Sequence, residues 1–342
     1  MARRAEPPAG PALRSLSRAQ RGLADRLGEP GLRALTWAAS AAGMALIALL
    51  VYKVFDQAGE SVSHFGLGFL TANVWDPVSR RFGAASFVYG TAVSSLLALV
   101  IAGPLSIAIA LFLTELAPRR ARRPVATLVE LLAAIPSVVL GLWGIIVLAP
   151  FLVNTLEPAL HSAFGWIPLF EGSTSPFGLL PAILILTIMV VPIIASVTRE
   201  VFETVPGDLK ESALALGATR WEMVRMVILP YAKSGIVGAS ILGLGRALGE
   251  AIAVTQVIGD ATGVHASLFA PADTLASRVA STYQGATSTL EISSLAYLSA
   301  ILLVLALIVN VIARLIVRRS TLRMRRAGPR PGLAVTTAEA EV

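Results

Sequence analysis

An arginine and a glutamate stand four residues apart inside an apolar stretch of the chain. Arg246 and Glu250 lie in segment 234–257, which otherwise consists mainly of apolar and small residues. Side chains four apart share one face of a helix, so these two charges can pair. A guanidinium can also bind an oxyanion through two parallel hydrogen bonds. Two interpretations stay open: a structural ion pair, or an anion pathway in which Arg246 attracts the anion and Glu250 holds it or balances its charge.

The two charges are predicted to lie deep within a membrane span. Counting from Ser234 at about 1.5 Å per residue puts Arg246 about 18 Å into a helix, near the middle of a membrane span. A charge at that depth costs roughly 2.5–3.5 kcal/mol on insertion scales. We therefore expect Arg246 and Glu250 to face protein or a water-filled path.

A proline and a serine form a second polar interruption, within segment 125–153. Pro136 would lie about 16 Å into that segment, where it leaves a carbonyl one turn earlier without its partner. Ser137 brings a hydroxyl to a similar depth. The pair predicts a helix kink, which either packs against neighbouring helices or lines a pore.

The elements that position these residues are predicted to be membrane spans. The chain has 342 residues, of which 55% are hydrophobic and 14% charged, as in polytopic membrane proteins. It has no cysteine and three widely separated histidines, so no metal-ligand spacing is present. Six apolar segments approach the ~20 residues needed to cross a bilayer: 34–55, 86–114, 125–153, 177–198, 234–257 and 293–317.

Basic residues predict the orientation of these spans. The segments 1–33, 115–124, 199–233 and 314–342 together hold 23 lysines and arginines, whereas the opposite connections hold 3. Basic connections face the cytoplasm. Both termini are therefore expected there, and the net charge of +7 is assigned to the anionic membrane surface and not to nucleic acid.

One cytoplasmic connection has a recognisable pattern. Residues 211–230 read ESALALGATRWEMVRMVILP. They predict a short helix that ends near Gly217, where glycine permits a turn, and a second helical piece over 221–227 that Pro230 closes. Small residues on the short helix would allow close approach of a soluble partner.

This connection resembles the EAA loop of permease subunits in ATP-binding-cassette (ABC) importers. The matching positions are Glu211, Ser212, Ala213, Gly217, Val227, Leu229 and Pro230, with serine and valine replacing the usual alanine and isoleucine. The resemblance implies that this loop contacts a separate ATPase. The chain itself has no GxxxxGK[ST] phosphate-binding loop, so we expect no enzymatic activity and no cofactor here, with ATP and Mg²⁺ on the partner ATPase.

Two further stretches resemble a more specific family of permeases. IPSVVLGLWG (135–144) and GLGRALGEAIAV (243–254) are similar to phosphate permeases of the PstC type, and the likeness covers about 86–317. It implies a type I importer fold and phosphate passage near Arg246 and Glu250. It also implies three kinds of partner: a homologous PstA-type permease, two ATPase subunits, and a periplasmic or lipid-anchored phosphate-binding protein.

The predicted protein is all-α, with six spans in a bacterial cytoplasmic (inner) membrane. Its expected parts are a disordered basic arm (1–33), a first transmembrane helix (34–55), a periplasmic connection (56–85), a permease domain (86–317) with its coupling loop (199–233), and a basic tail (318–342). Two alternatives stay open. The chain could carry another oxyanion such as sulfate or molybdate, or it could be a scaffold or phosphate sensor that docks an ATPase without transport.

Overall fold

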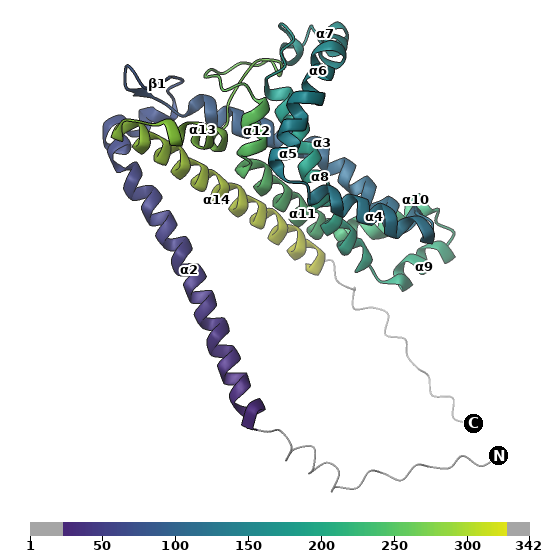
Figure 1. Ribbon diagram of the computed structural model, residues 1–342. Coiled ribbons are helices and arrows are strands. Elements are labelled where there is room, and N and C mark those ends of the chain that lie inside the picture. Colours follow the sequence, from purple (N-terminus) through teal and green to yellow (C-terminus); the bar gives the residue numbers. More distant parts are fainter. Residues whose placement is uncertain (1–22, 327–342) are drawn as a thin grey trace, which may run out of the picture. The chain divides into compact units, whose positions relative to one another are not determined.

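The computed structural model describes residues 23–326, which are mostly helical (Figure 1). Six helices in this range are long and apolar enough to cross a membrane. They are Gly31–Leu70, Ala85–Leu116, Ser137–Phe164, Leu179–Glu203, Arg220–Gly249 and Thr289–Leu315. The prediction of an all-α protein with six spans is therefore confirmed.

The chain divides into two compact units, residues 1–56 and 57–342. The described part of the first unit belongs to one helix, α2 (Leu23–Phe65). The span predicted at 34–55 is thus part of a longer helix, and residues 23–33 of the predicted disordered arm are helical. Residues 1–22 of that arm lie outside the described residues, as do residues 327–342 of the predicted tail.

The second unit contains the end of α2 and all later elements. The connection predicted at 56–85 holds the last turns of α2, the 3-10 helix η1 (Gly66–Leu70) and a small hairpin of β1 (Trp75–Asp76) and β2 (Arg81–Phe82). The remaining α-helices are α3 (Ala85–Leu111), α4 (Arg119–Ala133), α5 (Ser137–Trp143), α6 (Ala149–Phe151), α7 (Glu157–Phe164), α8 (Leu179–Glu203), α9 (Gly207–Ala215), α10 (Arg220–Met223), α11 (Leu229–Gly249), α12 (Ile252–Val257), α13 (Leu275–Thr282) and α14 (Thr289–Arg326).

Short helical segments of other geometry join several of these helices. The π-helical segments are η2 (Phe112–Leu116), η3 (Gly144–Leu148), η4 (Leu152–Leu156) and η6 (Val224–Ile228). The 3-10 segments η5 (Pro168–Phe170) and η7 (Tyr283–Gly285) lie in loops. The π segments let α3 continue into η2 and let α5, α6 and α7 form one apolar span.

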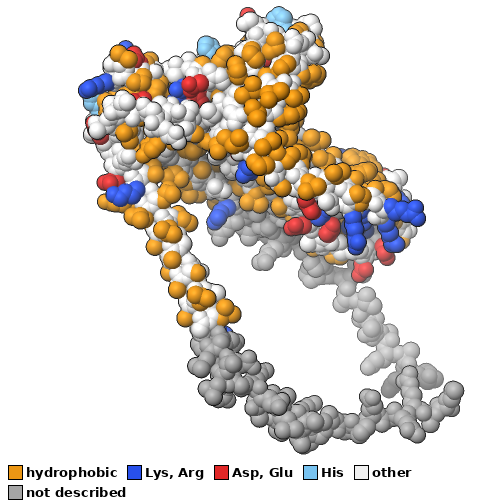
Figure 2. Space-filling view, viewed as in Figure 1, with side chains coloured by type: hydrophobic (Ala, Val, Ile, Leu, Met, Phe, Trp, Pro, Cys, Tyr) orange, Lys and Arg blue, Asp and Glu red, His pale blue; other side chains and the backbone are white. Residues whose placement is uncertain are grey.

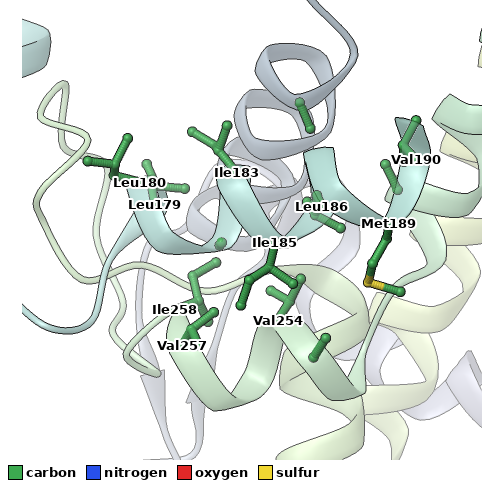
Figure 3. Packing of buried hydrophobic residues seen from close by; sticks show 14 of the residues in the cluster. Leu179, Leu180, Ile183, Ile185, Leu186, Met189, Val190, Val254, Val257 and Ile258 are labelled. Atoms are coloured by element: carbon green, nitrogen blue, oxygen red, sulfur yellow. The ribbon is translucent and has the colours of Figure 1, made fainter. Parts of the chain in front are cut away.

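Helix α8 forms the centre of the second unit, packed against α3 and α11. Its long apolar run buries most of its residues, and several of them meet Val254, Val257 and Ile258 in the main core (Figure 3). Small residues permit the close approach of α11: a Cβ added at Gly235 would lie 2.5 Å from Val201 of α8. Pro192 lies inside α8 and Pro104 inside α3.

The span predicted at 125–153 is wrong in its position. Residues 119–133 form α4, a separate helix with four arginines in its first turns and none of its residues buried. The chain then becomes extended at Pro136 (φ −59°, ψ 139°) and the apolar span begins at Ser137. Pro136 therefore separates two helices and does not kink one, because proline has no amide hydrogen to donate and disfavours the helical conformation in the residue before it.

Apolar and charged side chains occupy different parts of the second unit. Figure 2 shows charges near α4, α9 and α10, and again near β1 and α13, with mainly apolar surface between them. The apolar part includes exposed residues of α3, α5 and α14, such as Val100, Leu142 and Leu307. Such a belt between two charged ends suits a protein surrounded by lipid.

Candidate functional site

The loop with the importer pattern forms a short helix that stands off the core. Helix α8 ends at Glu203, Pro206 precedes α9, and α9 runs over Gly207–Ala215 without a buried residue. Glu211 and Ser212 on α9 are exposed. Ala213 instead packs against a core cluster that contains Phe202 and Met223. The predicted short helix is therefore present, with Ala213 turned inward and with Glu211 and Ser212 exposed.

The chain turns at Gly217 after α9, as the sequence predicts. Gly217 has a φ of +88°, a conformation that costs other residues strain. Thr219 then begins α10 with a capping box, in which its hydroxyl accepts from the Glu222 amide and the Glu222 carboxylate accepts from the Thr219 amide. These features fix the direction in which the chain leaves α9.

Large apolar side chains project from the same loop. Leu216 is 89% exposed and Trp221 is 65% exposed, and Leu209 and Leu214 are also exposed. Exposed apolar side chains that gather in one region are a feature of protein–protein contact surfaces. The pattern match did not single out Leu216 or Trp221, although their size in a charged connection was the available signal.

The predicted closure of the second helical piece at Pro230 is wrong. Helix α10 continues through the π segment η6 into α11, and Pro230 occupies one of the first positions of α11. Leu229 and Val227 pack against the same core cluster as Ala213. The loop pattern therefore anchors the start of α11 to the core and leaves α9 outside it.

An ion pair that no sequence pattern predicts joins α9 to another helix. Lys210 Nζ lies 2.6 Å from Glu115 Oε1 of η2, 95 residues earlier in the chain. The two side chains are only 20% and 16% exposed. Both residues line a groove of about 470 Å³, together with Arg220 and apolar residues that include Leu214 and Trp221.

The charged pair of the fifth span is present, but the helix is interrupted there. Arg246 lies in the last turn of α11, and Glu250 is extended (ψ 118°) before α12 begins. The expected continuous helix through 234–257 is therefore wrong. Arg246 Nη2 and Glu250 Oε2 are 3.8 Å apart, which exceeds a hydrogen-bond distance, while Glu250 Oε1 accepts from the Ala253 amide of α12 at 3.2 Å.

The two residues differ in access. The Arg246 side chain is 45% exposed, whereas the Glu250 side chain is 8% exposed. Glu250 thus helps to fix the start of α12, and the Arg246 guanidinium keeps donors available for an anion. The bond to Ala253 supports the structural interpretation for Glu250, and the anion pathway stays a prediction.

The second sequence stretch lies against α12. Helix α5 packs on α12, and a Cβ at Gly141 would lie 3.0 Å from the Ala253 Cα. A Cβ at Gly144 would lie 2.9 Å from Val257 Cγ1. The structure thus brings both resemblance stretches together, while Ser137 is half-buried at the first turn of α5 and has no recorded hydrogen bond to Arg246 or Glu250 among the described residues.

A buried ionic cluster lies near α13, and sequence reasoning missed it. Arg278 Nε is 2.7 Å from Asp273 Oδ2, and Arg278 Nη2 is 2.9 Å from Asp260 Oδ1. The guanidinium carbon also lies 4.9 Å from the ring centre of Phe87. Burial raises the pKa of the Asp273 carboxyl to about 7, and the nearby Arg278 charge opposes that rise.

Hydrogen bonds extend this cluster into a tie between helices. The Thr91 hydroxyl of α3 accepts from the Leu275 amide of α13, and the Ser277 hydroxyl donates to Thr255 of α12. Gly90 lets the Asp273 backbone approach α3 closely. No group of three His, Asp or Glu side chains that could hold a metal ion occurs among residues 23–326.

The arrangement is that of a membrane permease subunit, and comparisons with known proteins agree. The family model of binding-protein-dependent transport system inner membrane components matches residues 102–322. The phosphate transport system permease protein PstC of Mesorhizobium japonicum is 46% identical over 84% of this chain and 89% of its own. PstC of Pasteurella multocida is 46% identical (80% and 87% covered), and PstC 2 of Mycobacterium tuberculosis is 43% identical (84% and 91% covered).

Solved structures support the fold alone. A bacterial alginate ABC transporter in complex with an alginate-bound periplasmic protein matches with a TM-score of 0.56 at 20% identity, over 86% of this chain and 98% of its own. A second structure of a bacterial alginate importer gives 0.52 at 20% identity, over 84% and 98%. The chain belongs to the inner membrane components of binding-protein-dependent transport systems and, within them, to the PstC family of phosphate permeases.

Proposed function

We propose that this chain is one of two homologous permease subunits that move inorganic phosphate across a bacterial inner membrane at the expense of ATP. The observation that carries the proposal is its identity of 46% to PstC phosphate permeases over most of both chains. The half-exposed Arg246 guanidinium supplies a cation suited to that anion. The second permease would be of the PstA type.

Energy would reach this chain through α9. ATP and Mg²⁺ belong on two separate ATPase subunits, and a periplasmic or lipid-anchored phosphate-binding protein would deliver the substrate. The exposed Glu211, Leu216 and Trp221 support docking of an ATPase at this loop. Closure of the ATPases would move α9 and switch the spans between outward and inward opening, because a docked partner shifts an equilibrium when it favours one arrangement.

Orientation follows from the distribution of charge. The basic residues of α4 and of the loop around α9 support a cytoplasmic position for that end of the second unit and for both termini. The hairpin and the Arg278 cluster would then lie on the periplasmic side, where the binding protein delivers phosphate.

The proposal is tested with the complete complex in proteoliposomes that contain ATP and Mg²⁺. We expect uptake of radiolabelled phosphate that requires ATP and the binding protein and that excess unlabelled phosphate suppresses. Sulfate or molybdate uptake without phosphate uptake would overturn the assignment of phosphate as the substrate. A complex that binds its ATPases but transports no oxyanion would instead support a function as a scaffold or as a phosphate sensor.

A further inference from the structure

We propose that the ion pair between Lys210 and Glu115 transmits the displacement of α9 to α3. This inference rests on the proposed function, in which ATPase closure moves α9. It assigns to two residues outside the loop pattern a positioning role in coupling ATP hydrolysis to transport.

The first step of the argument is the weak attachment of α9 to the protein. None of its residues is buried, although Ala213 makes a partial contact with the core. Its two ends are fixed, because Val205 before it and Met223 after it are buried. Between those ends α9 can tilt about the extended Pro206 and the turn at Gly217.

The second step is that one side-chain bond restricts this tilt. Lys210 is near the middle of α9, and its bond to Glu115 is the one ion pair or side-chain hydrogen bond that links α9 to another element within residues 23–326. Leu111, Leu116 and Trp221 line the groove beside it. An ion pair shielded by apolar side chains is stronger than one in open water.

The third step concerns what Glu115 is attached to. It lies in η2, which continues α3 without a break. Helix α3 packs along α8 over much of its length, and the Ser106 hydroxyl donates to the Val191 carbonyl of α8 at 3.0 Å. A displacement of Lys210 therefore reaches α3 directly, whereas the chain connection through Pro206 reaches α8.

The pair thus gives α9 two mechanical connections to the spans. The backbone connection leads to α8, and the ion pair leads to α3, which carries the Phe87 and Thr91 contacts to α13 at its other end. With the pair intact, α3 and α8 move together when α9 moves. Without it, a displacement of α9 reaches α3 only indirectly, through the packing of α3 on α8.

The test measures phosphate transported and ATP hydrolysed in the same proteoliposomes with the complete complex. Lys210→Ala and Glu115→Ala should each lower the phosphate transported per ATP about fivefold, with the ATPase subunits still bound and hydrolysis retained. The double exchange Lys210→Glu with Glu115→Lys should restore most of that ratio. Lys233→Ala is the matched control, because Lys233 is exposed on nearby α11, and it should leave the ratio unchanged.

Three results would overturn this inference. The first is an unchanged ratio in both alanine variants. The second is loss of the ATPase subunits from the complex, since the pair would then serve docking. The third is a double exchange that folds and assembles but stays as poorly coupled as the single variants. Absence of phosphate uptake in the wild type would instead refute the function on which the inference rests.

Discussion

Arg278 shows how a single residue can hold several elements in place. Its guanidinium contacts Asp260, Asp273 and the Phe87 ring, and it is 9% exposed. Removing one member of a buried ion pair typically costs about 3–5 kcal/mol, because the remaining charge is left without a partner. The substitution Arg278→Met should therefore lower the thermal stability of the purified chain in detergent.

The loss of stability should depend on pH. Burial raises the pKa of Asp273 to about 7 in the folded protein, so folding takes up a proton between the ordinary aspartate value and about pH 7. The stability from Asp273 is present at low pH and is lost as pH rises through the folded pKa. Without Arg278 that pKa rises further, so the difference between variant and wild type should be larger at about pH 8.5 than at about pH 6.

Unfolding midpoints at the two pH values measure this effect. Arg81→Met is the control, because Arg81 is exposed on the hairpin of β1 and β2. An equal loss at both pH values for Arg278→Met would show that the cluster does not depend on the protonation of Asp273.

For single residues, the sequence predicted contacts only between side chains that are close along the chain. Arg246 and Glu250 are four residues apart and were predicted to share a helical face, and their charged groups lie 3.8 Å apart across the end of α11. Lys210 and Glu115 are 95 residues apart, and Asp260 and Asp273 lie in a loop whose path no periodic pattern indicates. Such pairs depend on tertiary contacts.

Glycines determine how closely the helices pack. Gly235 and Gly238 are three residues apart on α11, yet a Cβ at Gly235 would lie 2.5 Å from both Cγ atoms of Val201, while a Cβ at Gly238 would meet nothing within 4 Å. Valine is β-branched and has little freedom to move aside in a helix. Gly235→Ala should therefore destabilise the chain by about 1–3 kcal/mol through overpacking.

Gly238→Ala supplies a matched comparison in the same helix. It should leave the unfolding midpoint unchanged or raise it, because alanine favours a helix over glycine by up to about 1 kcal/mol. Thermal unfolding of both variants in detergent is the measurement. Equal midpoints for the two variants would contradict the close packing of α11 on α8.

At the scale of elements, the sequence predicted the long apolar spans well and their interruptions poorly. The run in α8 could be recognised because most of its residues are apolar and buried. Pro136 was interpreted as a kink, but proline also stands before helices, as it does at α5. The break at Glu250 comes directly after Gly249, and the Glu250 carboxylate accepts from the Ala253 amide, a contact that no periodic pattern indicates.

For the whole molecule, the absence of cysteine makes orientation directly measurable. Ser212→Cys on α9 and Ser173→Cys before α8 place single thiols at exposed positions. A membrane-impermeant maleimide added to intact cells with a permeable outer membrane should label the cysteine at 173 and not the one at 212. Both should react after the membrane is opened, because basic connections remain in the cytoplasm. Labelling of the cysteine at 212 in intact cells would show that the chain has the opposite orientation in the membrane.

We propose that Arg246 belongs to the path that phosphate takes, and phosphate uptake by the complete complex tests this role. Three forms are compared at equal amounts in the membrane: wild type, Arg246→Ala, and the exchange Arg246→Glu with Glu250→Arg. A hydrogen bond to a charged group is worth roughly 1.5–3 kcal/mol, so the alanine variant should lose about tenfold or more of its uptake rate. We predict that the exchange does not restore uptake, because it moves the cation from the half-exposed position to the buried one. Recovery of uptake by the exchange would contradict the claim and make the pair structural.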